Sequence, residues 1–138
     1  MMNEEVLNGP QLWLRRLGWV ILLLAAGFWT LFTGGEVVSG LVSDDPEAAT
    51  ALVGGLMEFA VFAVPLWVGA ILVWRWPPVG AALLLLDGVV LMITFVVRVL
   101  TFYVSPAALV MTALTLGLPP LASGLLFLVA WRRGKKAR

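Results

Sequence analysis

Apolar residues fill four long stretches of this chain, and only short polar segments separate them. Each stretch matches the roughly 20 residues that an α-helix needs to cross a bilayer. The pattern predicts an all-α fold: an integral membrane four-helix transmembrane bundle that runs up-down-up-down and forms a single domain over 1–138. The expected helices span about 11–33, 48–74, 78–103 and 106–131, with an extracytoplasmic loop at 34–47 and a basic C-terminal tail at 132–138.

Turn and capping residues mark the boundaries of these helices. Asp45-Pro46-Glu47 predicts a helix start, because aspartate caps a first turn, proline suits the first helical position and an acidic side chain favours the positive end of the helix dipole. Ser105-Pro106 starts the last helix in the same way. The tight turn Trp74-Arg75-Trp76-Pro77-Pro78 makes the second and third helices antiparallel neighbours. No internal repeat is evident.

The composition agrees with a membrane protein and narrows the chemistry. Hydrophobic residues make up 62% of the chain and charged residues 12%, with a mean hydropathy of +1.03, whereas a soluble domain is about 25% charged. The chain contains no cysteine and no histidine, which excludes disulfides, thiolate nucleophiles, zinc sites and a histidine haem ligand. We therefore expect no enzyme, no catalytic residues, no metal and no cofactor. We expect the lipid bilayer as a partner, and we expect no binding of nucleic acid.

The distribution of basic residues predicts the orientation. In a four-helix arrangement, every basic residue except Arg98 falls on one side: Arg15, Arg16, Arg75, Arg132, Arg133, Lys135, Lys136 and Arg138. The segment 34–47 contains acidic residues and no basic one. The positive-inside rule then places both termini and the 74–78 turn in the cytoplasm, as in a multi-pass protein of the prokaryotic inner membrane. The basic tail serves as a topology anchor, and binding of anionic lipid is its alternative role.

Each predicted helix carries one stripe of small or polar residues among larger apolar ones. The clearest stripes follow the spacing that places residues on one helical face. They comprise Asp87, Leu91, Thr94, Arg98 and Thr101 on the third helix and Thr112, Thr115, Pro119 and Ser123 on the fourth. Two interpretations stay open. The stripes serve close packing, since small residues and hydroxyls hold membrane helices together, or they line a polar cavity inside the bundle.

Three ionisable residues, Glu58, Asp87 and Arg98, fall within the predicted membrane region. A charge at a helix centre costs about 2.5–3.5 kcal/mol even on the lenient insertion scale, so such a group faces the interior and has a partner. The antiparallel second and third helices place Glu58 less than one turn from Arg98, which predicts a Glu58–Arg98 pair. The pair either fixes the helix register or forms the outer gate of a transport path. Snorkelling of Arg98 to the membrane boundary is a third option.

Asp87 has no basic residue at its depth, roughly 12 Å from the cytoplasmic end of its helix at 1.5 Å per residue. Ser123 on the fourth helix shares this depth. A protonated Asp87 carboxyl that bonds to Ser123 or to a backbone carbonyl would be a structural feature. The same arrangement is how a proton-coupled site begins, so both interpretations stay open.

Prolines inside the second and fourth helices, Pro65, Pro119 and Pro120, predict kinks. Each lacks a backbone N–H and frees a carbonyl one turn earlier. These carbonyls lie near Val61, Thr115 and Leu116. A freed carbonyl in the membrane must find a donor in a neighbour, a hydroxyl or water. Donors are also expected from the indole groups deep in the membrane, those of Trp19, Trp29 and Trp67, if they face the interior.

Two motifs carry a resemblance. The motif P-x8-W-R-W-x3-G runs from Pro65 to Gly80, and L-P-P-L-x2-G-L-L-F-L-x2-W-R-R runs from Leu118 to Arg133. Together they resemble a family of small uncharacterised prokaryotic four-helix membrane proteins, classed as a domain of unknown function. This resemblance implies the topology and no mechanism. A weaker resemblance, in Arg16-Leu17-Gly18 and Leu56-Met57-Glu58, is to DoxX-type membrane proteins and would imply a redox or quinone-linked role.

From these observations we expect a small polytopic membrane protein that acts through its helix bundle or through partner interactions, as a homo-oligomer or within a membrane complex. The alternative is a small transporter or channel component with a polar intramembrane site. That site would comprise Asp87, Glu58, Arg98, Thr94, Ser123, Thr112 and Thr115.

Overall fold

The computed structural model describes residues 9–102 and 105–136, and the regular structure in these ranges is helical. The elements are α1 (Gly9–Val42), α2 (Ala48–Glu58), η2 (Phe59–Ala63), α3 (Val64–Arg75), α4 (Pro77–Phe102), α5 (Pro106–Thr112), η3 (Ala113–Gly117) and α6 (Leu118–Lys136). They form four long helical spans, each apolar enough to cross a membrane. The predicted all-α bundle is therefore confirmed. The predicted helix end at Tyr103 and the tail residues 137–138 lie outside the described residues.

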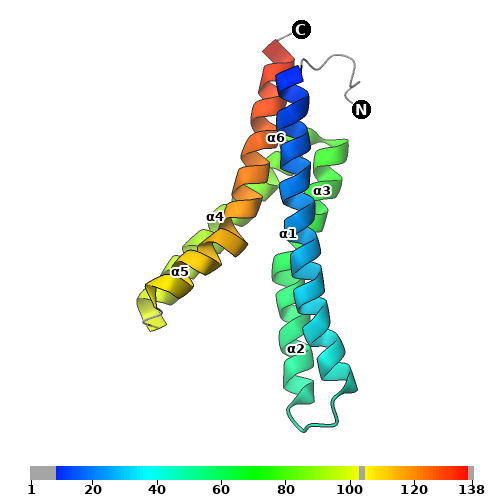
Figure 1. Ribbon diagram of the computed structural model, residues 1–138, viewed down its shortest axis with the longest axis vertical. Coiled ribbons are helices and arrows are strands. Elements are labelled where there is room, and N and C mark those ends of the chain that lie inside the picture. Colours follow the sequence, from blue (N-terminus) through cyan, green and yellow to red (C-terminus); the bar gives the residue numbers. More distant parts are fainter. Residues whose placement is uncertain (1–8, 103–104, 137–138) are drawn as a thin grey trace.

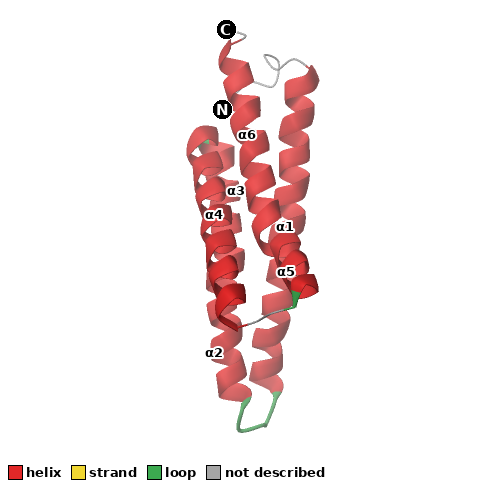
Figure 2. Cartoon of the chain, turned by 90° about the vertical axis from the view of Figure 1, so that its left-hand side faces the viewer, coloured by secondary structure: helices red, strands yellow, loops and turns green. Residues whose placement is uncertain are grey.

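The first helix is longer than the sequence pattern predicts. The helix expected at 11–33 continues to Val42, so most of the loop predicted at 34–47 is helical. Only residues 43–47 connect α1 to α2, and the backbone N–H of Glu47 bonds to the Asp45 side chain there at 3.3 Å. The connection is thus a short turn (Figure 2).

Glycines let the extension of α1 pack closely against α2. A Cβ atom at Gly40 would lie 2.9 Å from the backbone nitrogen of Leu52 in α2. Likewise, a Cβ atom at Gly55 of α2 would lie 3.1 Å from the backbone nitrogen of Val37 in α1. Small residues allow such close approach of helices in membranes. The extension therefore has a closely packed antiparallel partner in α2.

The second and fourth spans are each broken by a π-helical turn, η2 or η3. The residue after each turn, Val64 or Leu118, donates its N–H to the carbonyl five residues back. The next residue is a proline in both cases, Pro65 or Pro119. A proline lacks the donor for an α-helical bond and its ring collides with the carbonyl four residues back, and a π-helical turn accommodates this mismatch. The prolines predicted to kink the helices therefore stand directly beside the breaks.

The molecule divides into a packed half and two arms (Figure 1). In the packed half, α3 and α6 lie against the beginnings of α1 and α4. Beyond the breaks, the end of α1 with α2 forms the first arm and the end of α4 with α5 forms the second arm. Figure 1 shows the two arms diverging. The second span thus leaves α4 at its break and follows α1 instead.

The buried core lies in the packed half. It comprises Leu22, Ala25, Ala26, Trp29, Ala63, Leu66, Ala70, Val73, Ala81, Leu84 and Phe127. Glycines again set the closest contacts: Gly69 of α3 lies against Leu84 of α4, and Gly88 of α4 lies against Leu121 of α6. In the arms, α5 has no buried residue and α2 has only Gly55. Most of the arm surface is consequently uncovered in a single chain.

Candidate functional site

Trp29 contacts both helix breaks. Its indole N–H donates to the carbonyl of Thr115 in η3 at 3.2 Å, and its ring packs against Phe62 in η2 with 4.9 Å between ring centroids. Only 9% of Trp29 is exposed. The Thr115 carbonyl is the group that Pro119 leaves without its helical donor. The expectation that a neighbour would satisfy this carbonyl is therefore confirmed, and the donor is one of the deep tryptophans.

A second indole links the first two spans. Trp67 of α3 donates its Nε1–H to the hydroxyl of Thr30 at 2.9 Å, and this hydroxyl donates to the Ala26 carbonyl at 2.7 Å. The buried Thr33 hydroxyl donates to the carbonyl of Trp29 at 2.6 Å. Polar side chains of α1 thus bond within their own helix and to the neighbouring span close to the breaks.

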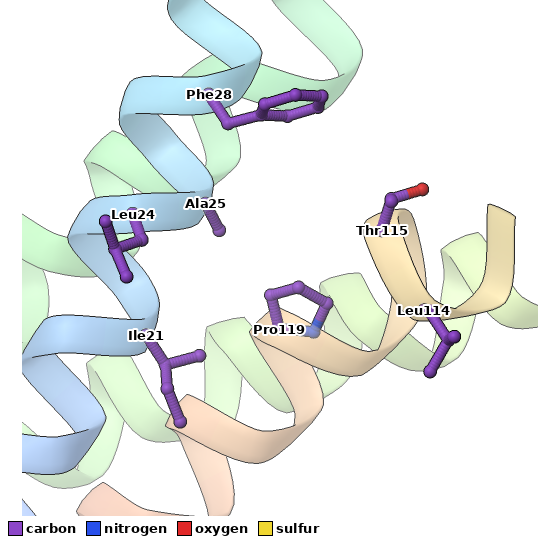
Figure 3. Close-up of a pocket in the computed structure, with 7 residues that line it drawn as sticks. All are labelled: Ile21, Leu24, Ala25, Phe28, Leu114, Thr115 and Pro119. Atoms are coloured by element: carbon purple, nitrogen blue, oxygen red, sulfur yellow. The ribbon is translucent and has the colours of Figure 1, made fainter. Parts of the chain in front are cut away.

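An apolar pocket of about 320 Å³ opens between α1 and the broken fourth span. Figure 3 shows its lining of Ile21, Leu24, Ala25, Phe28, Leu114, Thr115 and Pro119. The one polar residue of this lining, Thr115, already donates its hydroxyl to the Met111 carbonyl at 2.9 Å. The chemistry of the pocket therefore suits a hydrocarbon chain better than a polar solute.

Asp87 lies half-buried on α4 in the packed half and does not line that pocket. Its Oδ2 atom is buried and has no hydrogen-bond partner among the described residues. Ser123, the partner expected from the sequence, is fully buried in α6 but donates its hydroxyl to the Pro120 carbonyl at 3.2 Å. The structure therefore places Asp87 inside the bundle without the bond that the sequence suggested.

The structure does not bring Glu58 and Arg98 together within one chain. Glu58 ends α2 in the first arm, one turn after Gly55, where an added Cβ atom would lie 3.2 Å from the Cβ of Glu36 on α1. Arg98 is exposed on α4 in the second arm. The Glu58–Arg98 prediction assumed a straight second span beside α4. The break at η2 instead turns the span toward α1, so Glu58 meets another acid.

The remaining predicted site residues do not gather around one cavity. Thr94 is exposed on α4, near Arg98. Thr112 is half-buried at the junction of α5 and η3, where its carbonyl accepts a 3.4 Å bond from the Thr115 hydroxyl. Within residues 9–102 and 105–136, no group of three or more His, Cys, Asp or Glu side chains could hold a metal ion.

Sequence reasoning missed two residues that organise this region. Glu36 fell in a segment predicted to be a loop, so its position opposite Glu58 was not anticipated. Trp29 was expected to find an acceptor, but its contact with both breaks was not foreseen. The prolines could have pointed to Trp29, because each carbonyl that a proline frees needs a hydrogen-bond donor at the same depth.

Taken together, these features describe an all-α bundle of four candidate membrane spans, two of them broken at the level of Trp29. Residues 6–138 match the family described as Domain of unknown function (DUF7670), and the chain belongs to this family. No curated protein and no solved structure matches the chain. The predicted membership of a family of unknown function is thus confirmed over nearly the whole chain, whereas the resemblance to DoxX-type proteins stays a prediction.

Proposed function

We propose that the protein is a multi-pass, non-enzymatic protein of the prokaryotic inner membrane that acts by binding a partner within the membrane through its two arms. The observation that carries this proposal is that the arms diverge and are largely unburied, as described above. The packed half supplies a stable base, and the arms supply the surface that a partner would cover.

The face of α4 that points toward the second span supports this proposal. In the packed half this face meets α3 at Gly80 and Leu84, and at 100° per residue it continues through Thr94, Arg98 and Thr101. Because α2 leaves α4 at the break, these last three side chains are exposed. An arginine in the membrane costs about 2.5–3.5 kcal/mol on the lenient scale. A partner that covers this face would therefore lower the free energy of the assembly.

Hydrogen bonding favours packing over a polar cavity. Several hydroxyls of the polar stripes donate to carbonyls one turn earlier in their own helices, as Thr115 does and as Thr101 does to Val97 at 2.8 Å. A hydroxyl satisfied in this way does not need water or a polar solute. The stripes therefore support a role in helix association, in line with the behaviour of small and hydroxyl residues in membranes.

The arrangement of charged residues supports a cytoplasmic location of both termini. The beginning of α1, the end of α6 and the turn between α3 and α4 lie toward the same end of the molecule (Figure 1). Arg75 lies over the ring of Trp76 at 5.4 Å, and Lys135 lies over Trp131 at 4.4 Å. Basic and aromatic residues of this kind are typical of the cytoplasmic membrane interface. Anionic lipid at the basic tail fits the same location.

Photo-crosslinking in living cells tests the partner-binding proposal. A photoreactive amino acid would replace Thr94 on the open face of α4, and the control would replace Val96, which is exposed at the same depth about 200° around the helix. We expect a protein adduct from position 94 and none from position 96. Lack of any protein adduct at position 94, or equal adducts at both positions, would refute the proposal.

A second candidate function is proton-coupled transport through Asp87, and the buried Oδ2 atom without a partner favours it. Intramembrane carboxyls of this kind mark proton relays in pumps and transporters. In vesicles that contain a pH-sensitive dye, Asp87→Asn should abolish proton flux if this function holds. The exposed loop residue Asp44 supplies the control, Asp44→Asn. Under the partner-binding proposal, neither substitution changes proton flux.

A further inference from the structure

We propose that the partner is a second copy of this chain, and that Arg98 of each copy pairs with Glu36 and Glu58 of the other. This inference rests on the partner-binding function proposed above, because it names the occupant of the open face. It makes the protein a symmetric dimer whose arms pack against each other in the membrane.

Charge complementarity carries the inference. In the first arm, Glu36 of α1 lies against Gly55 of α2, one turn before Glu58, and no described residue forms an ion pair with either acid. Both acids are half-buried, so they are partly reachable from outside the arm. In the second arm, Arg98 is exposed and no described residue forms an ion pair with it. Each chain thus presents an acidic pair on one arm and an unpaired cation on the other.

Depth supports pairing between copies in the same orientation. Glu58 and Arg98 stand at nearly equal distances along the chain from the turn at Trp76-Pro77, one before it and one after it. At 1.5 Å per residue, these distances of 18 and 21 residues put both groups in the half of the membrane away from that turn. Two copies inserted with the same orientation therefore hold Arg98 of one in the same half of the membrane as the acids of the other. An antiparallel pair would not align these groups.

Symmetry closes the assembly. In a two-fold dimer each contact occurs twice, so Arg98 of each copy contacts the acidic pair of the other copy. Each Arg98 and each acidic pair is then engaged, so the two-fold contact closes without a third copy. Thr94, exposed one turn before Arg98, can form a hydrogen bond across helices at the same interface. Breaking a buried ion pair by removing one member leaves an uncompensated charge, which makes the dimer sensitive to single substitutions.

Fluorescence energy transfer between full-length copies tests this inference. The chain has no cysteine, so Ser43→Cys in the exposed connection between α1 and α2 provides one labelling site. Donor- and acceptor-labelled protein would be reconstituted together in phosphatidylcholine vesicles at increasing protein-to-lipid ratios. We expect Arg98→Ala, and likewise Glu36→Gln with Glu58→Gln, to raise the dissociation constant at least about tenfold. Arg132→Ala, an exposed arginine on α6, should leave it unchanged.

An exchange of charges between copies distinguishes the loss of ion pairing from the misfolding of a variant. Arg98→Glu alone and Glu58→Arg alone should each weaken self-association, whereas a mixture of the two variants should recover energy transfer, because each contact in the mixed dimer again sets a group of opposite charge against position 98. No transfer in the wild-type protein, unchanged transfer in Arg98→Ala, or no recovery in the mixture would each overturn the dimer. If Arg98 meets lipid headgroups instead, Arg98→Ala leaves transfer unchanged.

The crosslinking experiment separates this inference from the function on which it rests. A Thr94 adduct with the mass of two copies supports the dimer. An adduct with a different protein overturns the dimer and leaves partner binding standing. No protein adduct overturns both.

Discussion

The bond from Trp29 to the Thr115 carbonyl yields a specific prediction, Trp29→Phe. The substitution keeps an aromatic ring against Phe62 and removes the indole donor at 3.2 Å. Hydrogen bonds between membrane helices average about 0.6 kcal/mol and reach about 1.7 kcal/mol. Because Pro119 offers no substitute donor, the carbonyl is left unsatisfied, at a cost of about 1–3 kcal/mol. We therefore expect Trp29→Phe to lower the free energy of unfolding by about 1–2 kcal/mol.

A double-mutant cycle isolates the physical cause. Pro119→Ala restores an N–H that the Thr115 carbonyl can accept within its own helix, so the indole donor is no longer required. In that background Trp29→Phe should cost about 1 kcal/mol less than in the wild-type chain. Steric trapping in lipid–detergent bicelles measures each free energy of unfolding. An equal cost in both backgrounds would refute the explanation, because the stabilisation would then come from ring packing alone.

Other predictions concern close packing and the second indole. Gly80→Ala should lower the free energy of unfolding by about 1–3 kcal/mol, because its Cβ would collide with the backbone nitrogen of Val73. Gly27 has open space around it, so Gly27→Ala should raise the free energy of unfolding by about 0.5–1 kcal/mol. If Gly27→Ala destabilised the protein more than Gly80→Ala, the packing of α3 on α4 would be contradicted. Trp67→Phe and Thr30→Val remove the two sides of a 2.9 Å bond, so their unfolding costs should be coupled by about 0.5–1.5 kcal/mol. Strict additivity in that cycle would show that the bond contributes nothing.

The four spans could be predicted because hydropathy acts over about 20 residues and tolerates local exceptions. Local capping chemistry was also predictable: the Ser105 hydroxyl accepts from the Ala108 N–H at 3.3 Å, as its position before Pro106 indicates. Pro65 and Pro119 marked the helix breaks for the same reason, since a missing N–H is a property of the residue itself. These features depend on few neighbours along the chain.

Features that depend on contacts between distant segments could not be predicted in this way. The helical extension of α1 over Glu36 depends on Gly40 and Gly55 meeting α2 closely, and no local pattern reports that contact. The Glu58–Arg98 hypothesis assumed that proline bends a helix only slightly. The direction of a break is set by packing on both sides of it, and here α2 follows α1. The contact of Trp29 with both breaks depends on the same packing.

The position of both breaks at the level of Trp29 has a mechanical consequence. The 11 residues of α2 give a lever about 16 Å long at 1.5 Å per residue, pivoting beside a single indole ring. A swing of only about 10° at the pivot would carry its tip by about 3 Å, while the base stays in place. A small change in the packing of Trp29 against Phe62, whose ring centroids lie 4.9 Å apart, would thus be magnified at the far end of α2.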